Sequence, residues 1–170
     1  MQNLSDYIGQ IISITQRSIW KREYEIRSEK EVIGKFVYPK FFSERVECKL
    51  VNDTFEFRRP HIFSNDIEIR KSGYQLPIAV MHLNFLASKG IVDLPRGKKV
   101  VMKFGTFKSK AEIYHGENDL IAIVNNKFSF KEKCEITIER RTEILDENPW
   151  LVFLAFYFLQ LKRRNTGVAH

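Results

Sequence analysis

The segment that decides the fold lies near the end of the 170-residue sequence and reads Asn148-Pro149-Trp150-Leu151-Val152-Phe153-Leu154-Ala155-Phe156-Tyr157-Phe158-Leu159-Gln160-Leu161-Lys162-Arg163-Arg164. This pattern predicts one helix with no polar face. Asn148 suits the N-cap, Pro149 suits the first turn, and the basic end complements the negative pole of the helix dipole. The segment reaches roughly 20 Å, short of a hydrocarbon core of about 30 Å. We therefore expect the helix to lie inside the protein.

The side chains that we expect to form the core of this helix are large and apolar: Trp150, Leu151, Phe153, Leu154, Phe156, Tyr157, Phe158 and Leu161. Burying about ten such side chains at about 1.5–3 kcal/mol each stabilises a fold by about 15–30 kcal/mol, which is an upper bound because denatured chains are partly collapsed. The chain is 44% hydrophobic and has no Pro-, Gly- or Ser-rich linker. These features exclude a disordered protein and predict one domain over residues 1–170.

The rest of the chain shows alternation with a period of two, which is typical of strands with one buried and one wet face. Trp20, Tyr24 and Ile26 fall on one expected inward face. Twelve segments fit this pattern: residues 11–15, 20–26, 33–38, 46–50, 54–58, 67–70, 78–83, 90–94, 99–104, 110–114, 120–125 and 134–140. Turn-forming residues separate them at intervals of roughly 8 to 12 residues, as in antiparallel barrels and sandwiches.

Together the strands and the helix predict a mainly β fold. A barrel of about twelve strands has a lumen too wide for its own side chains to fill, so it needs a filling element. We expect an antiparallel barrel over about residues 18–142 that encloses the apolar helix over residues 148–164. Cys48 and Cys134 fall on inward strand positions and have no Cys or His at metal-ligand spacing, so we expect two core thiols and no zinc site.

A resemblance to a known family rests on several segments in a fixed order: Lys21-Arg22-Glu23-Tyr24-Glu25-Ile26-Arg27, Val32-Ile33-Gly34-Lys35, Thr54-Phe55-Glu56-Phe57-Arg58-Arg59, Ile67-Glu68-Ile69-Arg70, Leu94-Pro95-Arg96-Gly97-Lys98 and the final run from Pro149 to Leu161. In this order the chain resembles the superfamily of tubby C-terminal domains, LURP-one-related proteins and phospholipid scramblases. The resemblance covers nearly the whole chain.

The resemblance implies a twelve-stranded barrel around a hydrophobic C-terminal helix. It also implies roles linked to phosphoinositide binding, lipid movement or membrane-tethered signalling, although fold alone is a weak guide to activity. No stretch matches the phosphoinositide ligands of tubby unambiguously. The proline-rich region and the calcium-type acidic segment of scramblases are also missing from the sequence, which argues against scrambling itself.

Enzyme chemistry has no motif in this sequence. His61, His82, His115 and His170 share no spacing typical of a metal pair or of a catalytic base beside a nucleophile. No glycine-rich loop of the phosphate-binding kind occurs. Residues 117–119 lack the ligand spacing of a calcium loop. We therefore expect a protein without catalytic residues, cofactor or metal.

The sequence carries a formal charge of +7, which favours an anionic partner. Two clusters could converge on a barrel rim, and the candidate anion- or lipid-binding residues are Arg96, Lys98, Lys99, Lys103, Lys108, Lys110, Arg58 and Arg59. Anionic membranes attract such side chains by about 1 kcal/mol each. Nucleic acid is the less favoured partner, because no motif of a nucleic-acid-binding fold accompanies the charges.

These observations give a first hypothesis and two alternatives. The first is a non-enzymatic tubby-like module that binds anionic phospholipid peripherally through a basic surface. The second is a structural or protein-interaction domain whose charge keeps it soluble. The third is a scramblase-like protein that inserts the C-terminal helix into a membrane. The first residues show no secretory signal, so we expect a cytoplasmic protein that docks on the inner membrane surface.

Overall fold

The structure, a computed structural model, describes residues 3–18, 20, 22–29, 31–40, 44–61, 63–105, 109–127 and 133–167. Twelve strands follow one another around a closed barrel, each antiparallel to the next, and β1 pairs with β12 to close it. The strands are β1 (Ile11–Ser18), β2 (Glu23–Arg27), β3 (Val32–Val37), β4 (Val46–Leu50), β5 (Thr54–Arg58), β6 (Asp66–Lys71), β7 (Ala79–Leu83), β8 (Lys89–Asp93), β9 (Lys99–Phe104), β10 (Lys110–His115), β11 (Asp119–Lys127) and β12 (Lys133–Ile138). The predicted fold class is confirmed.

The alternation seen in the sequence sets which side chains enter the barrel. In β5, Phe55 and Phe57 are buried while the residues on either side of each are partly exposed on the outer wall. Cys48 and Cys134 are buried, as predicted, and burial raises the pKa of both thiols. Both sulfur atoms are therefore protonated core groups at neutral pH.

Helix α2 (Trp150–Gly167) fills the barrel. Every side chain from Trp150 to Leu161 is buried, so the predicted helix without a wet face is confirmed. Phe156 packs edge-to-face against Tyr24 and Phe36, which are direct partners on the adjacent strands β2 and β3, with ring centroids 5.5 and 5.1 Å away. Over the described residues, no helix combines the length and the apolar character needed to cross a membrane.

The start of α2 differs from the prediction by two residues. A short helix, α1 (Glu143–Glu147), precedes it, and the Thr142 hydroxyl caps α1 by accepting a 3.2 Å hydrogen bond from the Leu145 N–H. Asn148 ends α1 instead of capping α2, because its N–H donates to the carbonyl of Ile144 at 3.0 Å. The chain then turns at Pro149 into α2.

The prediction for Trp20 is wrong. We expected its side chain on the inward face with Tyr24 and Ile26, but it is 90% exposed. Strand β1 extends to Ser18, and the register of its pairing with β2 shifts between Gln16 and Ser18. Trp20 therefore belongs to the connection between β1 and β2, where the alternation of a strand does not apply.

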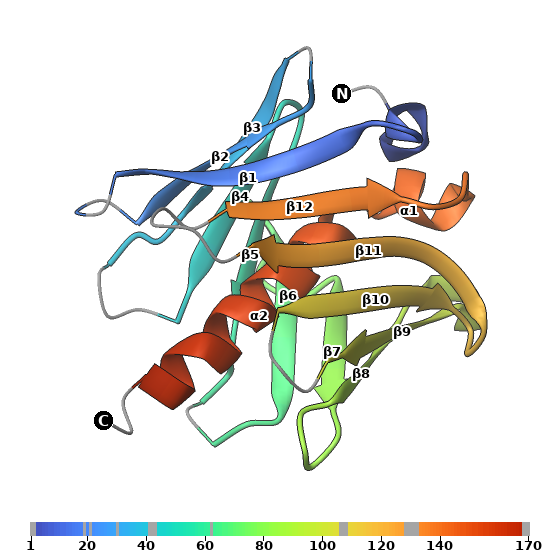
Figure 1. The fold of residues 1–170 in the computed structure, drawn as a ribbon. Coiled ribbons are helices and arrows are strands. Elements are labelled where there is room, and N and C mark those ends of the chain that lie inside the picture. Colours follow the sequence, from blue (N-terminus) through green and yellow to red (C-terminus); the bar gives the residue numbers. More distant parts are fainter. Residues whose placement is uncertain are drawn as a thin grey trace.

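The barrel has two ends, which we name after the course of α2. At the entry end α2 begins, beside α1 and the short 3-10 helix η1 (Leu4–Tyr7). At the exit end α2 finishes among the connections β1–β2, β3–β4, β5–β6 and β7–β8. Figure 1 shows η1 and α1 at one end of the barrel and the C-terminus emerging at the other. A second 3-10 helix, η2 (Pro95–Gly97), lies in the β8–β9 connection at the entry end.

Candidate functional site

The candidate residues around the β9–β10 hairpin do not gather on one rim. Arg96 and Lys98 lie in the β8–β9 connection and Lys99 starts β9, so these three lie at the entry end. Lys103 and Lys110 lie on the outer wall toward the exit end. The remaining candidate of this group, Lys108, lies outside the described residues.

Most of these cations already face a carboxylate. Lys98 Nζ lies 3.5 Å from Glu147 Oε2, and Lys110 Nζ lies 2.7 Å from Glu112 Oε1. Hydrogen bonds from Lys110 and Tyr114 lower the pKa of the Glu112 carboxyl, so the pair stays ionised at neutral pH. The β9–β10 wall is thus a surface of matched charges.

Arg58 and Arg59 are neighbours in sequence but have different surroundings. Arg58 lies on the outer wall, where its Nε is 3.1 Å from Glu68 Oε2. Arg59 begins the β5–β6 connection at the exit end, and its side chain is only 15% exposed. Its Nε lies 3.9 Å from Glu44 Oε2, a long ion pair. Arg59 therefore brings charge to the exit end, whereas Arg58 is matched by the wall.

The two ends differ in charge, counted over the described residues that lie outside the strands, including α1, η1 and the last turns of α2. The exit end has seven basic residues and one acidic residue: Arg22, Lys40, Arg45, Arg59, Lys162, Arg163, Arg164 and Glu44. The entry end has nine acidic and four basic residues: Asp6, Glu29, Glu31, Asp53, Glu117, Glu139, Glu143, Asp146, Glu147, Arg96, Lys98, Arg140 and Arg141. The barrel is therefore electrically polar, with its positive pole at the exit end.

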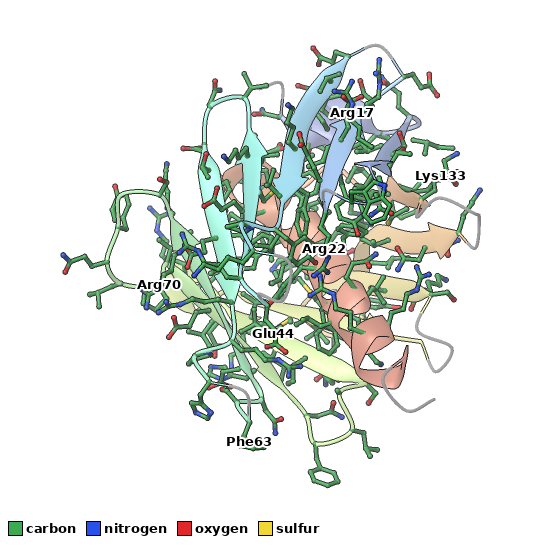
Figure 2. The ribbon with its side chains drawn as sticks, turned by 90° about the vertical axis from the view of Figure 1, so that its left-hand side faces the viewer. Arg17, Arg22, Glu44, Phe63, Arg70 and Lys133 are labelled. Carbon is green, nitrogen blue, oxygen red and sulfur yellow. The ribbon has the colours of Figure 1, made fainter. Side chains whose placement is uncertain are left out.

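The middle of the exit end is built around Tyr38. The guanidinium carbons of Arg22 and Arg164 lie 4.0 and 4.3 Å from the centre of its ring, close enough for cation–π attraction. Beside them, the Tyr157 hydroxyl donates a 2.7 Å hydrogen bond to the carbonyl of Glu44. Figure 2 shows Arg22 and Glu44 near the last turns of α2. Aromatic rings thus hold arginines from both ends of the sequence at one surface.

Large apolar side chains stand out from the same end. Phe63 is 92% exposed, Phe85 is 93% exposed and Leu86 is 75% exposed. We call these three the tip residues. Phe63 belongs to the β5–β6 connection, and the other two belong to the β7–β8 connection. Figure 2 shows Phe63 at the edge of the exit end, pointing away from the barrel.

Hydrogen bonds fix the β7–β8 connection. The Asn84 carboxamide oxygen accepts from the N–H groups of Ser88 at 2.8 Å and Lys89 at 2.9 Å, while the Ala87 N–H donates to the carbonyl of Asn84. Lys162 Nζ, from the end of α2, donates to the carbonyl of Ala87 at 3.0 Å. The tip of this hairpin is therefore held in place by a cation of the exit end.

Sequence reasoning missed the tip residues because it treated apolar residues mainly as core. The sequence does indicate that these side chains are exposed, because Phe85 and Leu86 lie between Asn84 and Ser88, and Phe63 precedes Ser64-Asn65-Asp66. Large apolar residues inside a run of turn-forming residues are expected at a loop tip, where burial in the core is not available.

Other features of the described surface are weaker candidates for a functional site. A hollow of about 500 Å³ on the outer wall is lined by residues of β4, β5, β6 and the connections next to them, among them Arg45, Glu56 and Arg70. Arg45 and Glu56 form an ion pair across it, 2.8 Å long. Within the described ranges, His, Cys, Asp and Glu nowhere form a group of three or more that could hold a metal ion.

Comparison of the chain with protein-family models, with curated proteins and with solved structures gives no match.

Proposed function

We propose that this protein is a non-enzymatic barrel that binds peripherally to anionic phospholipid surfaces through its exit end. The observation that carries the proposal is the division of charge, with seven basic residues against one acidic residue at the exit end and an acidic excess at the entry end. An anionic surface attracts the first end and repels the second, so the barrel docks with the C-terminus of α2 toward the lipid.

The strength of such docking follows from the number of cations that reach the surface. Each Lys or Arg near an anionic leaflet contributes about 1 kcal/mol, so four to six of them contribute about 4–6 kcal/mol. This corresponds to dissociation constants from about millimolar to tens of micromolar, which is reversible binding. The inner surface of a cell membrane, where anionic lipids are abundant, is the matching location.

The resemblance to the tubby-like superfamily supports the same proposal, since members of that superfamily are linked to membranes and lipids. The scramblase-like alternative has less support. It requires α2 to leave the barrel, yet the side chains from Trp150 to Leu161 are the filling of that barrel and are all buried. Their removal would empty the core and expose the inner face of every strand.

Vesicle co-sedimentation tests the proposal. We expect binding to vesicles with an anionic phospholipid and not to purely zwitterionic vesicles at about 0.15 M salt, with loss of binding at about 1 M salt because screening shortens the Debye length to about 3 Å. Equal binding to both vesicle types, or to neither, would contradict the proposal and leave the structural or protein-interaction alternative.

A matched pair of charge reversals locates the surface. Lys40→Glu/Arg163→Glu changes exposed cations of the exit end, and Arg96→Glu/Lys99→Glu makes the same change of charge at the entry end. We expect the first variant to bind anionic vesicles at least tenfold more weakly and the second to bind within about threefold of the wild type. The reverse order would assign docking to the entry end, through Arg96 and Lys99, instead.

A further inference from the structure

The tip residues lie on two hairpins that are neighbours in the wall. Strand β6 pairs with β7, and the rung nearest the exit end is the 2.9 Å hydrogen bond from the Leu83 N–H to the carbonyl of Asn65. Phe63 precedes this rung by two residues and Phe85 follows it by two. The two aromatic side chains are therefore presented by the same part of the exit end.

Both hairpins hold their tips in a fixed conformation. Around Phe63, the Ser64 N–H donates to the carbonyl of His61 at 2.9 Å, and the Ser64 hydroxyl accepts from the Asp66 N–H at 3.0 Å. Around Phe85, the Asn84 side chain closes the loop as described above. A side chain held out by a fixed loop loses little conformational freedom when it enters a binding partner.

Cations lie behind these apolar tips. Lys162 is tied to the β7–β8 loop through the carbonyl of Ala87, and Arg59 lies at the base of the β5–β6 connection. A bilayer has the complementary order along its normal, because anionic headgroups lie outside and hydrocarbon lies beneath them. Apolar area gains from leaving water, and the cations gain from the headgroups.

We propose that Phe63, Phe85 and Leu86 insert into the hydrocarbon edge of an anionic bilayer, so that the exit end prefers loosely packed or strongly curved lipid. This inference rests on the proposed function, because charge brings the exit end to the surface. Insertion at the interface reaches about 5–10 Å and depends on lipid packing. The side chains need gaps between headgroups, which curvature and unsaturated chains provide.

Tryptophan fluorescence measures insertion directly. The sequence has two tryptophans, of which Trp20 is exposed and Trp150 is buried. The probe is Phe85→Trp in a Trp20→Phe background, and the Trp20→Phe protein alone gives the baseline from Trp150. With anionic vesicles that contain phospholipid brominated in the acyl chain, we expect the fluorescence emission of the probe to shift to the blue and to be quenched. The emission of the Trp20→Phe baseline protein should not change. Binding without quenching would overturn insertion and leave the proposed function intact.

Affinity provides a second measurement. We expect Phe63→Ser/Phe85→Ser/Leu86→Ser to weaken binding to small, highly curved anionic vesicles about 100-fold, with a smaller loss on large vesicles. The control is Val51→Ser/Tyr74→Ser/Leu76→Ser, which removes exposed apolar groups at the entry end and is expected to change binding less than twofold. Equal affinity of the tip variant and the wild type on both vesicle sizes would overturn the inference.

The outcomes of these tests separate the two proposals. If neither the wild type nor the tip variant binds any anionic vesicle, the proposed function and the insertion both fail. If the wild type binds single-stranded nucleic acid but no vesicle, and the tip variant binds that nucleic acid more weakly, then the aromatic tips stack on bases and the lipid inference is overturned. Thermal denaturation of each variant shows whether the fold is intact, since substitutions at exposed tips are expected to leave stability nearly unchanged.

Discussion

The entry and exit ends of the barrel consist of the same kind of connection between antiparallel strands, yet different helical elements lie at each end. At the entry end η1 and α1 are bound to each other, with the Ser5 N–H donating to Asp146 Oδ1 at 2.9 Å and the Thr142 N–H donating to Ser5 Oγ at 3.3 Å. At the exit end no helix of the described chain lies across the mouth. Instead, the last turns of α2 emerge with their cations.

This difference separates the features that the fold requires from those that it does not. Both ends close the same filled barrel, so neither the excess of cations nor the tip residues at the exit end follow from packing. Exposed apolar groups also occur at the entry end, including Leu76 and Tyr74, but there they lie among an acidic excess. The exit end combines apolar tips with cations, and the proposed docking to an anionic bilayer rests on this combination.

The largest expected effect comes from a substitution that destroys the barrel between the two ends. We expect Phe156→Asp to cost about 4–5 kcal/mol or more, because an unpaired carboxylate would be buried between Tyr24 and Phe36. Such a loss takes most of the stability of a typical domain. Soluble yield and thermal denaturation measure it.

Arg163→Asp serves as the control for this change, since Arg163 is exposed on the same helix. It should cost less than about 1 kcal/mol, mainly through an unfavourable interaction with the helix dipole. A soluble and stable Phe156→Asp protein would refute the enclosed helix, and with it the existence of two separate ends.

Acid is expected to weaken the wall that separates the two ends. Burial raises the pKa of the Glu68 carboxyl, but hydrogen bonds from Arg70 and Arg58 outweigh it and lower the pKa overall. Hydrogen bonds from Lys127 and Lys133 likewise lower the pKa of Glu135 despite burial. These carboxylates stabilise the fold fully above their unfolded pKa of about 4.3, and the contribution is lost as the pH falls through the folded values.

Urea denaturation at a series of pH values measures this loss. We expect the free energy of unfolding to be flat near neutral pH and to fall progressively below about pH 4.5. A free energy of unfolding that is constant from pH 7 to pH 3 would contradict the role of these ion pairs.

Most of the fold could be predicted from the sequence because the barrel interior imposes one rule on every strand. A residue such as Phe57 must point inward, so alternation revealed the strands before any pairing was known. The apolar run in α2 was equally clear. The rule applies only within strands, and for this reason Trp20 is predicted on the wrong face and Asn148 is predicted to cap α2 although it ends α1.

The candidate site could be predicted only in part. Lys99 and Lys103 are close in sequence, but four residues of strand separate them by about 13 Å and carry them toward different ends. Which carboxylate neutralises which cation depends on the register between strands, as for Lys110 and Glu112. The exit end joins Arg22 to Arg164 through Tyr38, a contact that no local pattern in the sequence indicates.

Two milder substitutions measure how much the hydrogen bonds between each end and its helix contribute to stability. Tyr157→Phe removes the hydrogen bond to Glu44 at the exit end, and Ser5→Ala removes the hydroxyl that joins η1 to α1 at the entry end. Burial raises the pKa of the Tyr157 phenol, so a neutral hydroxyl donates this bond. Each change should cost about 1 kcal/mol in urea denaturation. A larger loss for Ser5→Ala alone would show that the entry end holds the barrel closed.

The smallest expected effect concerns the shape of one loop. Asn84→Ala removes three hydrogen bonds that fix the β7–β8 connection, two accepted by the carboxamide oxygen and one donated by the carboxamide nitrogen to the Ser88 hydroxyl, while leaving Phe85 and Leu86 unchanged. Because the loop is exposed, stability should fall by less than about 1 kcal/mol, whereas affinity for curved anionic vesicles should fall about threefold, since the tips must then be ordered on binding. Asn52→Ala, in the β4–β5 connection of the entry end, is the control and should not change affinity. If Asn84→Ala binds as tightly as the wild type, the exit end acts through its charge and apolar area alone, and the fixed conformation of its tips contributes nothing to docking.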